Sequence, residues 1–176
     1  ATQPPWGAPT FIAAAYHLGR FDGHYSQNRA DLPFEIPTDV YSLRWGEQDF
    51  VARTNKLRDP KYSNFVNGAF ADISIDVAEE FASLAHKIFH KAKSVPHGLS
   101  FGDSHARNLF PGESETVGID WAGLANEPLG ADIGVLIGSG LTFGISEARM
   151  ITDNETAIYD SYISGLKYSG WHGDLT

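Results

Sequence analysis

The sequence predicts a mainly helical α+β fold that forms a single domain over residues 1–176. With 176 residues, the chain is long enough to bury one core and too short for two domains of ordinary size. Apolar residues recur at helical spacing in most of the chain, whereas residues 99–119 break into short apolar runs with a turn between them. We therefore expect helices around one small β-hairpin.

The first half of the chain contains two predicted helices. The segment Pro9–Arg20 begins with proline and carries apolar residues at helical spacing, and we expect it to end at Gly19 and Gly23. The following segment, Asp22–Pro37, is rich in Asp, Asn, Pro and Gly and predicts a loop. A second, moderately amphipathic helix is predicted over Asp39–Thr54.

The clearest helical signal covers Ser74–Lys93. Its apolar stripe has charged residues opposite, which predicts that one face packs on the core; the stripe comprises Ile75, Val77, Phe81, Leu84, Ile88 and Phe89. Two further helices are expected over about Ala131–Phe143 and Ser146–Lys167.

The predicted hairpin spans Asn108–Asp120. Two apolar runs, Leu109-Phe110 and Val117–Ile119, flank the sequence PGESE at positions 111–115, and such a sequence is typical of a turn. We expect the loop that contains Asp103 to lie just before this hairpin.

Composition narrows the classes of partner and compartment. A formal net charge of −9 with only 13 Lys and Arg argues against a nucleic-acid partner and favours a neutral or cationic substrate. The chain has no cysteine, which favours a reducing, cytoplasmic setting. Its first residues lack the pattern of a signal peptide, and its best apolar stretch, Ile133–Ile145, is shorter than the roughly 18 residues that a membrane span needs. No membrane partner is therefore expected.

Three polar residues around the hairpin carry the chemical signal. Asp103 is followed five residues later by Asn108, and Asp120 comes directly after the second apolar run of the hairpin. Phosphoryl transfer needs a carboxylate to accept the proton of the substrate hydroxyl and oxygen ligands that hold Mg²⁺ on the phosphates. A short loop and a hairpin can bring these three side chains to one cleft.

These residues resemble the aminoglycoside phosphotransferase and choline kinase family. The motif-bearing stretches are GDSHARNLF at 102–110 and GIDW at 118–121, and the similarity extends to Pro128, Gly130, Asp132 and Ile133, and to HLGRFDG at 17–23. The resemblance implies the helical C-terminal lobe of a protein-kinase-like fold, with the hairpin at the catalytic loop.

The resemblance also implies roles for individual residues. Asp103 would be the catalytic base, Asn108 and Asp120 the Mg²⁺ ligands, and His105 a loop-stabilising or phosphate-side residue that assists cofactor binding. The implied activity is transfer of the γ-phosphate of ATP to a hydroxyl of an amino sugar, amino alcohol or similar small molecule. The N-terminal lobe that grips most of the nucleotide in this family has no counterpart in this chain, so we expect the chain alone to be inactive.

Two positions depart from the family pattern, and two other functions stay open. Phe101 replaces a histidine that usually precedes Gly-Asp, and Ala122 replaces an acidic residue that often follows Asp-Trp. One alternative is a metal-dependent phosphohydrolase that uses Asp103, His105 and Asp120. The other is a catalytically inactive kinase-like binding module.

Overall fold

The computed structural model describes residues 6–27, 52, 55–63, 75–112 and 114–174. Its contacts divide the chain into two compact units, one formed by Ala1–Asp39 with Pro96–Thr176 and the other by Val40–Val95. Whether the chain behaves as one domain stays a prediction. The described residues form mainly helices together with short antiparallel strand pairs, as the predicted α+β class requires.

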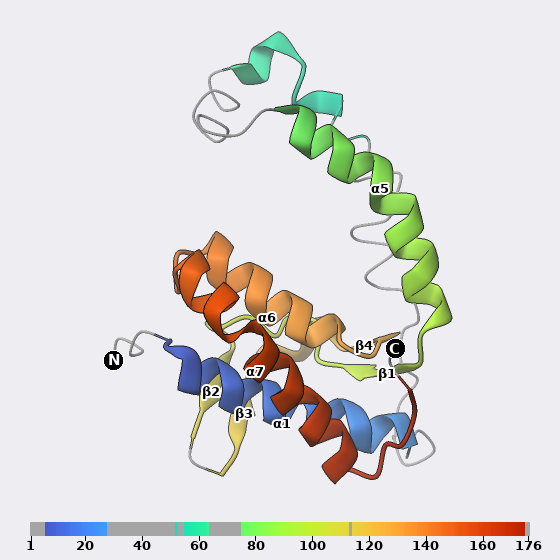
Figure 1. The fold of residues 1–176 in the computed structure, drawn as a ribbon, viewed down its shortest axis with the longest axis vertical. Helices are drawn as coiled ribbons and strands as arrows, with labels where there is room; N and C mark the ends of the chain where they lie inside the picture. Colours follow the sequence, from blue (N-terminus) through green and yellow to red (C-terminus); the bar gives the residue numbers. More distant parts are fainter. Residues whose placement is uncertain (1–5, 28–51, 53–54, 64–74, 113, 175–176) are drawn as a thin grey trace. The chain divides into compact units, whose positions relative to one another are not determined.

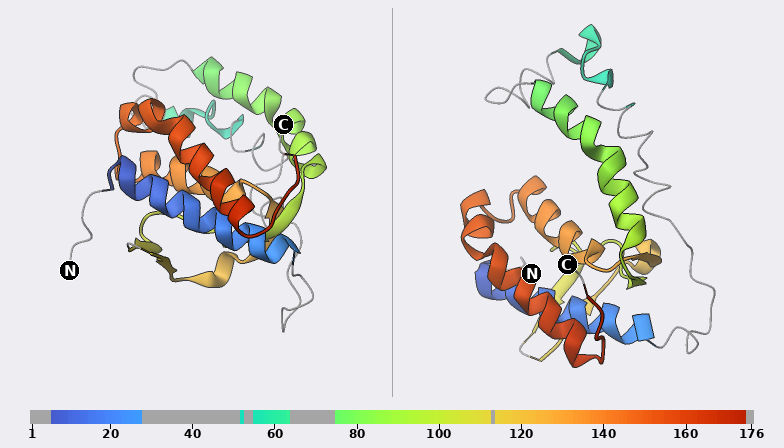
Figure 2. Two further views of the ribbon diagram at one scale, coloured as in Figure 1. Left: turned by 60° about the horizontal axis from the view of Figure 1, so that its bottom comes forward. Right: turned by 45° about the vertical axis from the view of Figure 1, so that its right-hand side comes forward.

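Helices α1 (Ala8–Gln27) and α7 (Ala148–Tyr168) lie side by side in the first unit (Figures 1 and 2). Their backbones approach closely at two glycines: a Cβ on Gly19 would collide with the carbonyl oxygen of Tyr162, and one on Gly165 with that of Tyr16. These glycines allow the helices to touch.

The prediction that the first helix ends at Gly19 and Gly23 is therefore wrong. Both glycines lie inside α1, which continues to Gln27, because they serve helix packing instead of termination. The predicted loop over Asp22–Pro37 is likewise wrong for its first part, which is helical; residues 28–37 lie outside the described residues.

Helix α6 (Ala131–Thr142) and α7 match the two helices predicted near the C-terminus. Together with α1 and the strands they enclose the core, whose largest fully buried apolar side chains are Tyr162, Phe11, Phe101, Leu136, Ile158 and Leu166. Trp6 lies across the edge of Phe11, with the ring centroids 5.2 Å apart.

The strands form two antiparallel pairs. Strands β2 (Leu109–Pro111) and β3 (Thr116–Gly118) make the predicted hairpin, with Leu109 opposite Gly118. Strands β1 (His97–Ser100) and β4 (Ala125–Pro128) form the second pair, with Ser100 opposite Ala125. The strand β4 was not expected, because its sequence ANEP contains no β-branched or aromatic residue and takes extended form through its pairing partner.

The second unit contains α5 (Ile75–Ser94), which confirms the predicted helix. The described apolar side chains Val77, Leu84 and Ile88 are 40–54% exposed, so the expectation that this face packs on the core is wrong for them. Before the helix, a 3₁₀ turn covers Pro60–Tyr62. The predicted helix over residues 39–54 lies outside the described residues apart from residue 52.

Ion pairs join the start of α5 to the segment before it. The Arg58 guanidinium donates to both carboxylate oxygens of Glu79 and, over 3.2 Å, to Asp76. Among the helices that the structure describes, none combines the length and the apolar character needed to cross a bilayer.

Candidate functional site

The loop that contains Asp103 connects β1 to β2. Near its start, Gly102 adopts a φ of +76°, and its backbone lies so close to Gly123 that a Cβ on Gly102 would collide with the carbonyl oxygen of Gly123. A side chain at position 102 would therefore be strained in conformation and would also displace the neighbouring turn. The conformation of the loop and its contact with Gly123 thus explain why position 102, in the Gly-Asp motif, is a glycine.

Asp132, at the start of α6, binds the backbone of this loop through hydrogen bonds. Its carboxylate accepts the N–H of Phe101 over 2.7 Å and the N–H of Gly102 over 2.9 Å. The Ser104 hydroxyl donates to the Asp132 carbonyl over 2.6 Å. Burial raises the pKa of Asp132, and the hydrogen bonds from Phe101 and Gly102 oppose that rise. The two residues that precede Asp103 are consequently fixed to a buried carboxyl group.

Three predicted site residues meet within the loop. The Asn108 side-chain amide donates to Asp103 Oδ2 over 2.9 Å and to the Asp103 carbonyl over 3.2 Å. His105 Nε2 lies 3.6 Å from Asp103 Oδ1. His105 Nδ1 accepts the N–H of Arg107, which places the proton of a neutral ring on Nε2, facing Asp103. The Asn108 amide thus orients the Asp103 carboxylate, His105 lies near its other oxygen, and the Asp103 side chain is 40% exposed.

Asp120 reaches the same region through the hairpin. The N–H of Ile119 donates to the Asn108 carbonyl over 2.9 Å, so the residue directly before Asp120 is paired with Asn108. Asp120 itself is exposed and adopts a left-handed conformation with φ 63°, which is uncommon for a residue with a side chain and is often found at functional sites. That its carboxylate joins Asn108 at one cation stays a prediction.

The two departures from the family pattern have different surroundings. Phe101 is 1% exposed and meets the ring of Trp121 edge-on at a centroid distance of 4.6 Å. The Trp121 indole N–H donates to the Gly118 carbonyl over 3.0 Å, so this aromatic contact joins the loop to the end of the hairpin. Phe101 therefore braces the loop by packing. Ala122 is exposed, and nothing in its surroundings explains the replacement.

The sequence did not single out two residues beside the loop. Phe143, directly after α6, contacts the His105 ring edge-on at 5.4 Å, and the Arg107 guanidinium lies 4.3 Å from the centre of the same Phe143 ring. The Arg107 guanidinium, which belongs to the Asp103 loop, is thereby held against Phe143. The only sequence signal for Arg107 was its place inside the motif, and Phe143 gave none.

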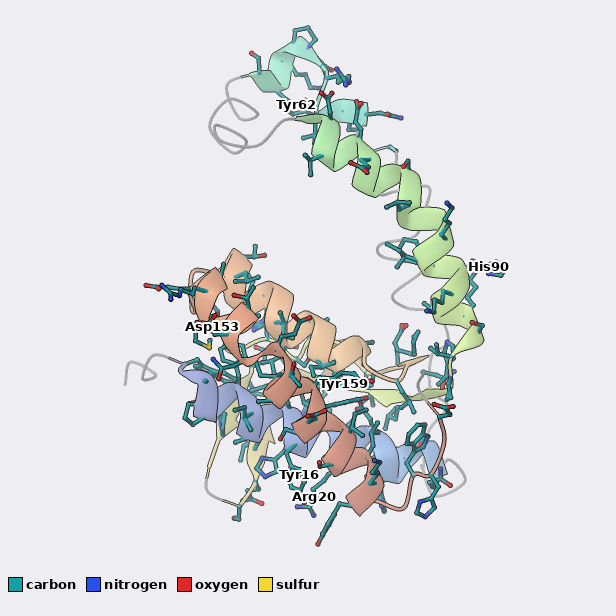
Figure 3. All side chains as sticks on the ribbon, in the orientation of Figure 1. Tyr16, Arg20, Tyr62, His90, Asp153 and Tyr159 are labelled. Carbon is teal, nitrogen blue, oxygen red and sulfur yellow. The ribbon has the colours of Figure 1, made fainter. Side chains whose placement is uncertain are left out.

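A cavity of about 670 Å³ lies at the turn of the hairpin, away from the Asp103 loop. It is lined by the C-terminal half of α1, the hairpin turn and the end of α7, with Arg20 4.6 Å from the centre of the Tyr168 ring. Figure 3 labels Arg20, which lines the cavity, and Tyr16, which lies one turn earlier on α1. None of the predicted site residues lines this cavity.

The donor chemistry of the predicted metal site suits Mg²⁺. The Asn108 amide nitrogen points to Asp103, so its amide oxygen is the atom that Asn108 offers to a cation, and Asp120 offers an exposed carboxylate. Mg²⁺ takes hard oxygen ligands and usually binds only one or two carboxylates, with water and phosphate completing its shell. In the described part of the chain no three His, Cys, Asp or Glu side chains cluster as a metal site, and such a cluster is not required for Mg²⁺ held mainly by phosphates.

Comparisons with protein-family models, with curated proteins and with solved structures gave no match for this chain.

Proposed function

We propose that this chain is the C-terminal lobe of a protein-kinase-like enzyme that transfers the γ-phosphate of ATP to a hydroxyl of a small molecule. One observation carries the proposal: the Asp103 carboxylate accepts the side-chain N–H of Asn108 inside a loop whose backbone is fixed to buried Asp132. This is the arrangement that a positioned base beside an amide ligand requires.

Asp103 acts as the base in this proposal. Asn108 donates to one of its oxygens, His105 lies near the other, and the exposed part of the carboxylate can receive a substrate hydroxyl. The carboxylate accepts the hydroxyl proton as the oxygen attacks phosphorus. General-base catalysis of this kind typically contributes about 10²- to 10⁴-fold to the rate.

Asn108 and Asp120 are the proposed ligands of Mg²⁺. When bound, the ion neutralises charge on the phosphates of ATP. Asn108 then has two functions, because its amide nitrogen orients the base while its amide oxygen faces the cation. Arg107, held on the Phe143 ring, supplies a positive charge beside the same loop.

The remaining parts of the proposal rest on the resemblance and on composition. The lobe that would grip most of the nucleotide is expected to precede this segment, and the acceptor is expected to be an amino sugar, an amino alcohol or a similar metabolite. The net charge of −9 suits a cationic acceptor, and the lack of cysteine suits the cytoplasm.

The decisive activity test uses the complete gene product that contains this segment, supplied with ATP, Mg²⁺ and a panel of aminoglycosides, amino alcohols and sugars. Product formation is expected for one acceptor class. Asp103→Asn should lower kcat by about 10²- to 10⁴-fold, and Asp120→Ala should be at least as damaging. Asp160→Asn, an exposed position on α7, serves as the matched control. Unchanged turnover in Asp103→Asn would refute the assignment of the base, and nucleotide binding without turnover would favour the inactive binding module.

A second test addresses the cation alone. Mn²⁺, a paramagnetic substitute for Mg²⁺, should broaden the backbone NMR signals of Asn108 and of Ile119–Trp121 before others in the 176-residue chain. The broadening should vanish in Asp120→Asn and persist in Asp160→Asn. Equal broadening in Asp120→Asn and the unaltered chain would remove Asp120 from the metal site.

A further inference from the structure

Beneath the Asp103 loop lie three buried ionisable side chains from three helices. Asp22 comes from α1, Asp132 from α6 and Tyr162 from α7, and all are almost fully buried. The Tyr162 hydroxyl donates to Asp22 Oδ2 over 2.6 Å and accepts the N–H of Gly130 over 2.8 Å. The sequence gave no reason to place Asp22 here, since it was assigned to a loop.

Tyr162 brings Asp22 close to Asp132, because the hydroxyl that donates to Asp22 also accepts the N–H of Gly130, two residues before Asp132. Two ionised carboxylates cannot face each other in a dry site without strong repulsion, so one proton has to lie between them. In the described part of the chain neither carboxyl group has a basic ion-pair partner that would offset the charge. The pair therefore carries one negative charge.

The hydrogen bonds decide which carboxyl group keeps the proton. Asp132 accepts two backbone N–H groups, those of Phe101 and Gly102, and both favour its ionised form. Asp22 accepts one hydroxyl, on Oδ2, and its Oδ1 has no donor partner although it is buried. A buried oxygen without a donor is explained if that oxygen carries the proton itself.

We propose that Asp22 is a positioning residue that stays protonated in the folded chain, donates its Oδ1–H to the Asp132 carboxylate, and so fixes the acceptor that holds the Asp103 loop. Burial and the neighbouring charge of Asp132 raise the pKa of Asp22 well above its usual value, in keeping with this assignment. Tyr162 also keeps its proton, because burial raises its pKa. The catalytic role of the loop rests on the proposed function. The location of the proton on Asp22 does not depend on that function.

The assignment predicts opposite outcomes for two isosteric substitutions. Asp22→Asn replaces the proposed O–H donor with an N–H donor and keeps an oxygen for Tyr162, so it should leave the unfolding equilibrium nearly unchanged near pH 5. Asp132→Asn puts an amide nitrogen against a backbone N–H and should raise the unfolding equilibrium constant on the order of 10- to 100-fold. Asp22→Ala should also destabilise, and Asp160→Asn is the exposed control. Damage from Asp22→Asn equal to that from Asp132→Asn would overturn the proposal.

The pH dependence of stability gives an independent readout. In the unfolded chain Asp22 loses its proton above about pH 4, whereas the folded chain keeps it, so the folded state binds more protons and loses stability as pH rises. The unfolding constant of the unaltered chain relative to that of Asp22→Asn should therefore rise about tenfold per pH unit from about pH 5 to the folded pKa of Asp22. A constant ratio over this range would mean that Asp22 is ionised in the folded chain.

NMR locates the proton and the loop directly. With ¹³C-labelled aspartate, the Asp22 carboxyl signal should stay in the protonated range at pH 7, and an ionised shift there would reject the proposal. Hydrogen exchange at the amides of Phe101 and Gly102 should accelerate in Asp22→Ala and be restored in Asp22→Asn; unchanged exchange in Asp22→Ala would contradict the positioning role. None of these measurements needs ATP, so they stay valid if the phosphotransferase proposal fails. If instead Asp22 proves to be ionised, the roles of Asp103 and Asp120 are still tested by the activity assay.

Discussion

Helices α1 and α5 each contain 20 residues, but the helix with the clearer apolar stripe in its sequence is the more exposed of the two. The segment of α5 shows the cleaner apolar stripe, yet its described residues Val77, Leu84 and Ile88 are well exposed. The segment of α1 contains two internal glycines and a buried aspartate, and it lies at the centre of its unit with Phe11 fully buried.

The difference shows that periodicity and burial measure separate properties. Apolar spacing describes what a helix could bury, whereas the partner decides what it does bury. In α1 the partner is α7, whose own Gly165 allows backbone contact, so small residues and a polar network join the large apolar side chains in this contact.

The largest effect is expected at Phe11, in the first turn of α1. Phe11→Ala removes a fully buried ring that packs against Trp6, and it should cost about 3–5 kcal/mol of stability because it leaves a cavity. Urea unfolding followed by circular dichroism measures the loss. Tyr159→Ala, at an α7 position that is 47% exposed and labelled in Figure 3, is the control and should cost far less. Equal losses would mean that the α1 core is not the stabilising region.

The helix contact itself is tested at Gly165. In an open helix, Gly→Ala stabilises by about 0.5–1 kcal/mol. Here the added Cβ would meet the Tyr16 carbonyl and the backbone nitrogen of Arg20, so Gly165→Ala should destabilise by about 1–3 kcal/mol. Gly138→Ala on α6 is the matched control, because nothing lies within 4 Å of its added Cβ. A stabilising Gly165→Ala would show that α1 and α7 are farther apart than described.

The smallest effect is expected on α5. Ile88→Ser and Val77→Ser exchange residues of similar helix propensity, so they report packing alone, and each should change stability by less than about 0.5 kcal/mol. Thermal unfolding of the two variants checks this value. A loss above about 1.5 kcal/mol would show that this face is covered in solution, and the contrast between α1 and α5 would then disappear.

The site was partly readable from the sequence. The order of Asp103, Asn108 and the hairpin is local, so the spacing was sufficient to predict that the Asp103 and Asn108 side chains turn toward one place and that Asp120 follows the second strand. The sequence did not predict that Asp132 anchors the loop. Asp132 lies 30 residues after Gly102, and its role depends on the packing of α6 against the loop.

The sequence by itself determined the helices α5, α6 and α7 and the hairpin, because these depend on contacts between residues close in the chain. Only the tertiary structure decided that α1 runs through Gly19 and Gly23, that β4 is a strand, and that Asp22, Asp132 and Tyr162 meet below the loop. Taken from the sequence alone, Gly19 predicts a helix end and Asp22 predicts a loop. The structure assigns both to the interior of α1, where they face α7. The approach of α7 gives both their reason, since it leaves no room for a Cβ at Gly19 and brings the Tyr162 hydroxyl to Asp22.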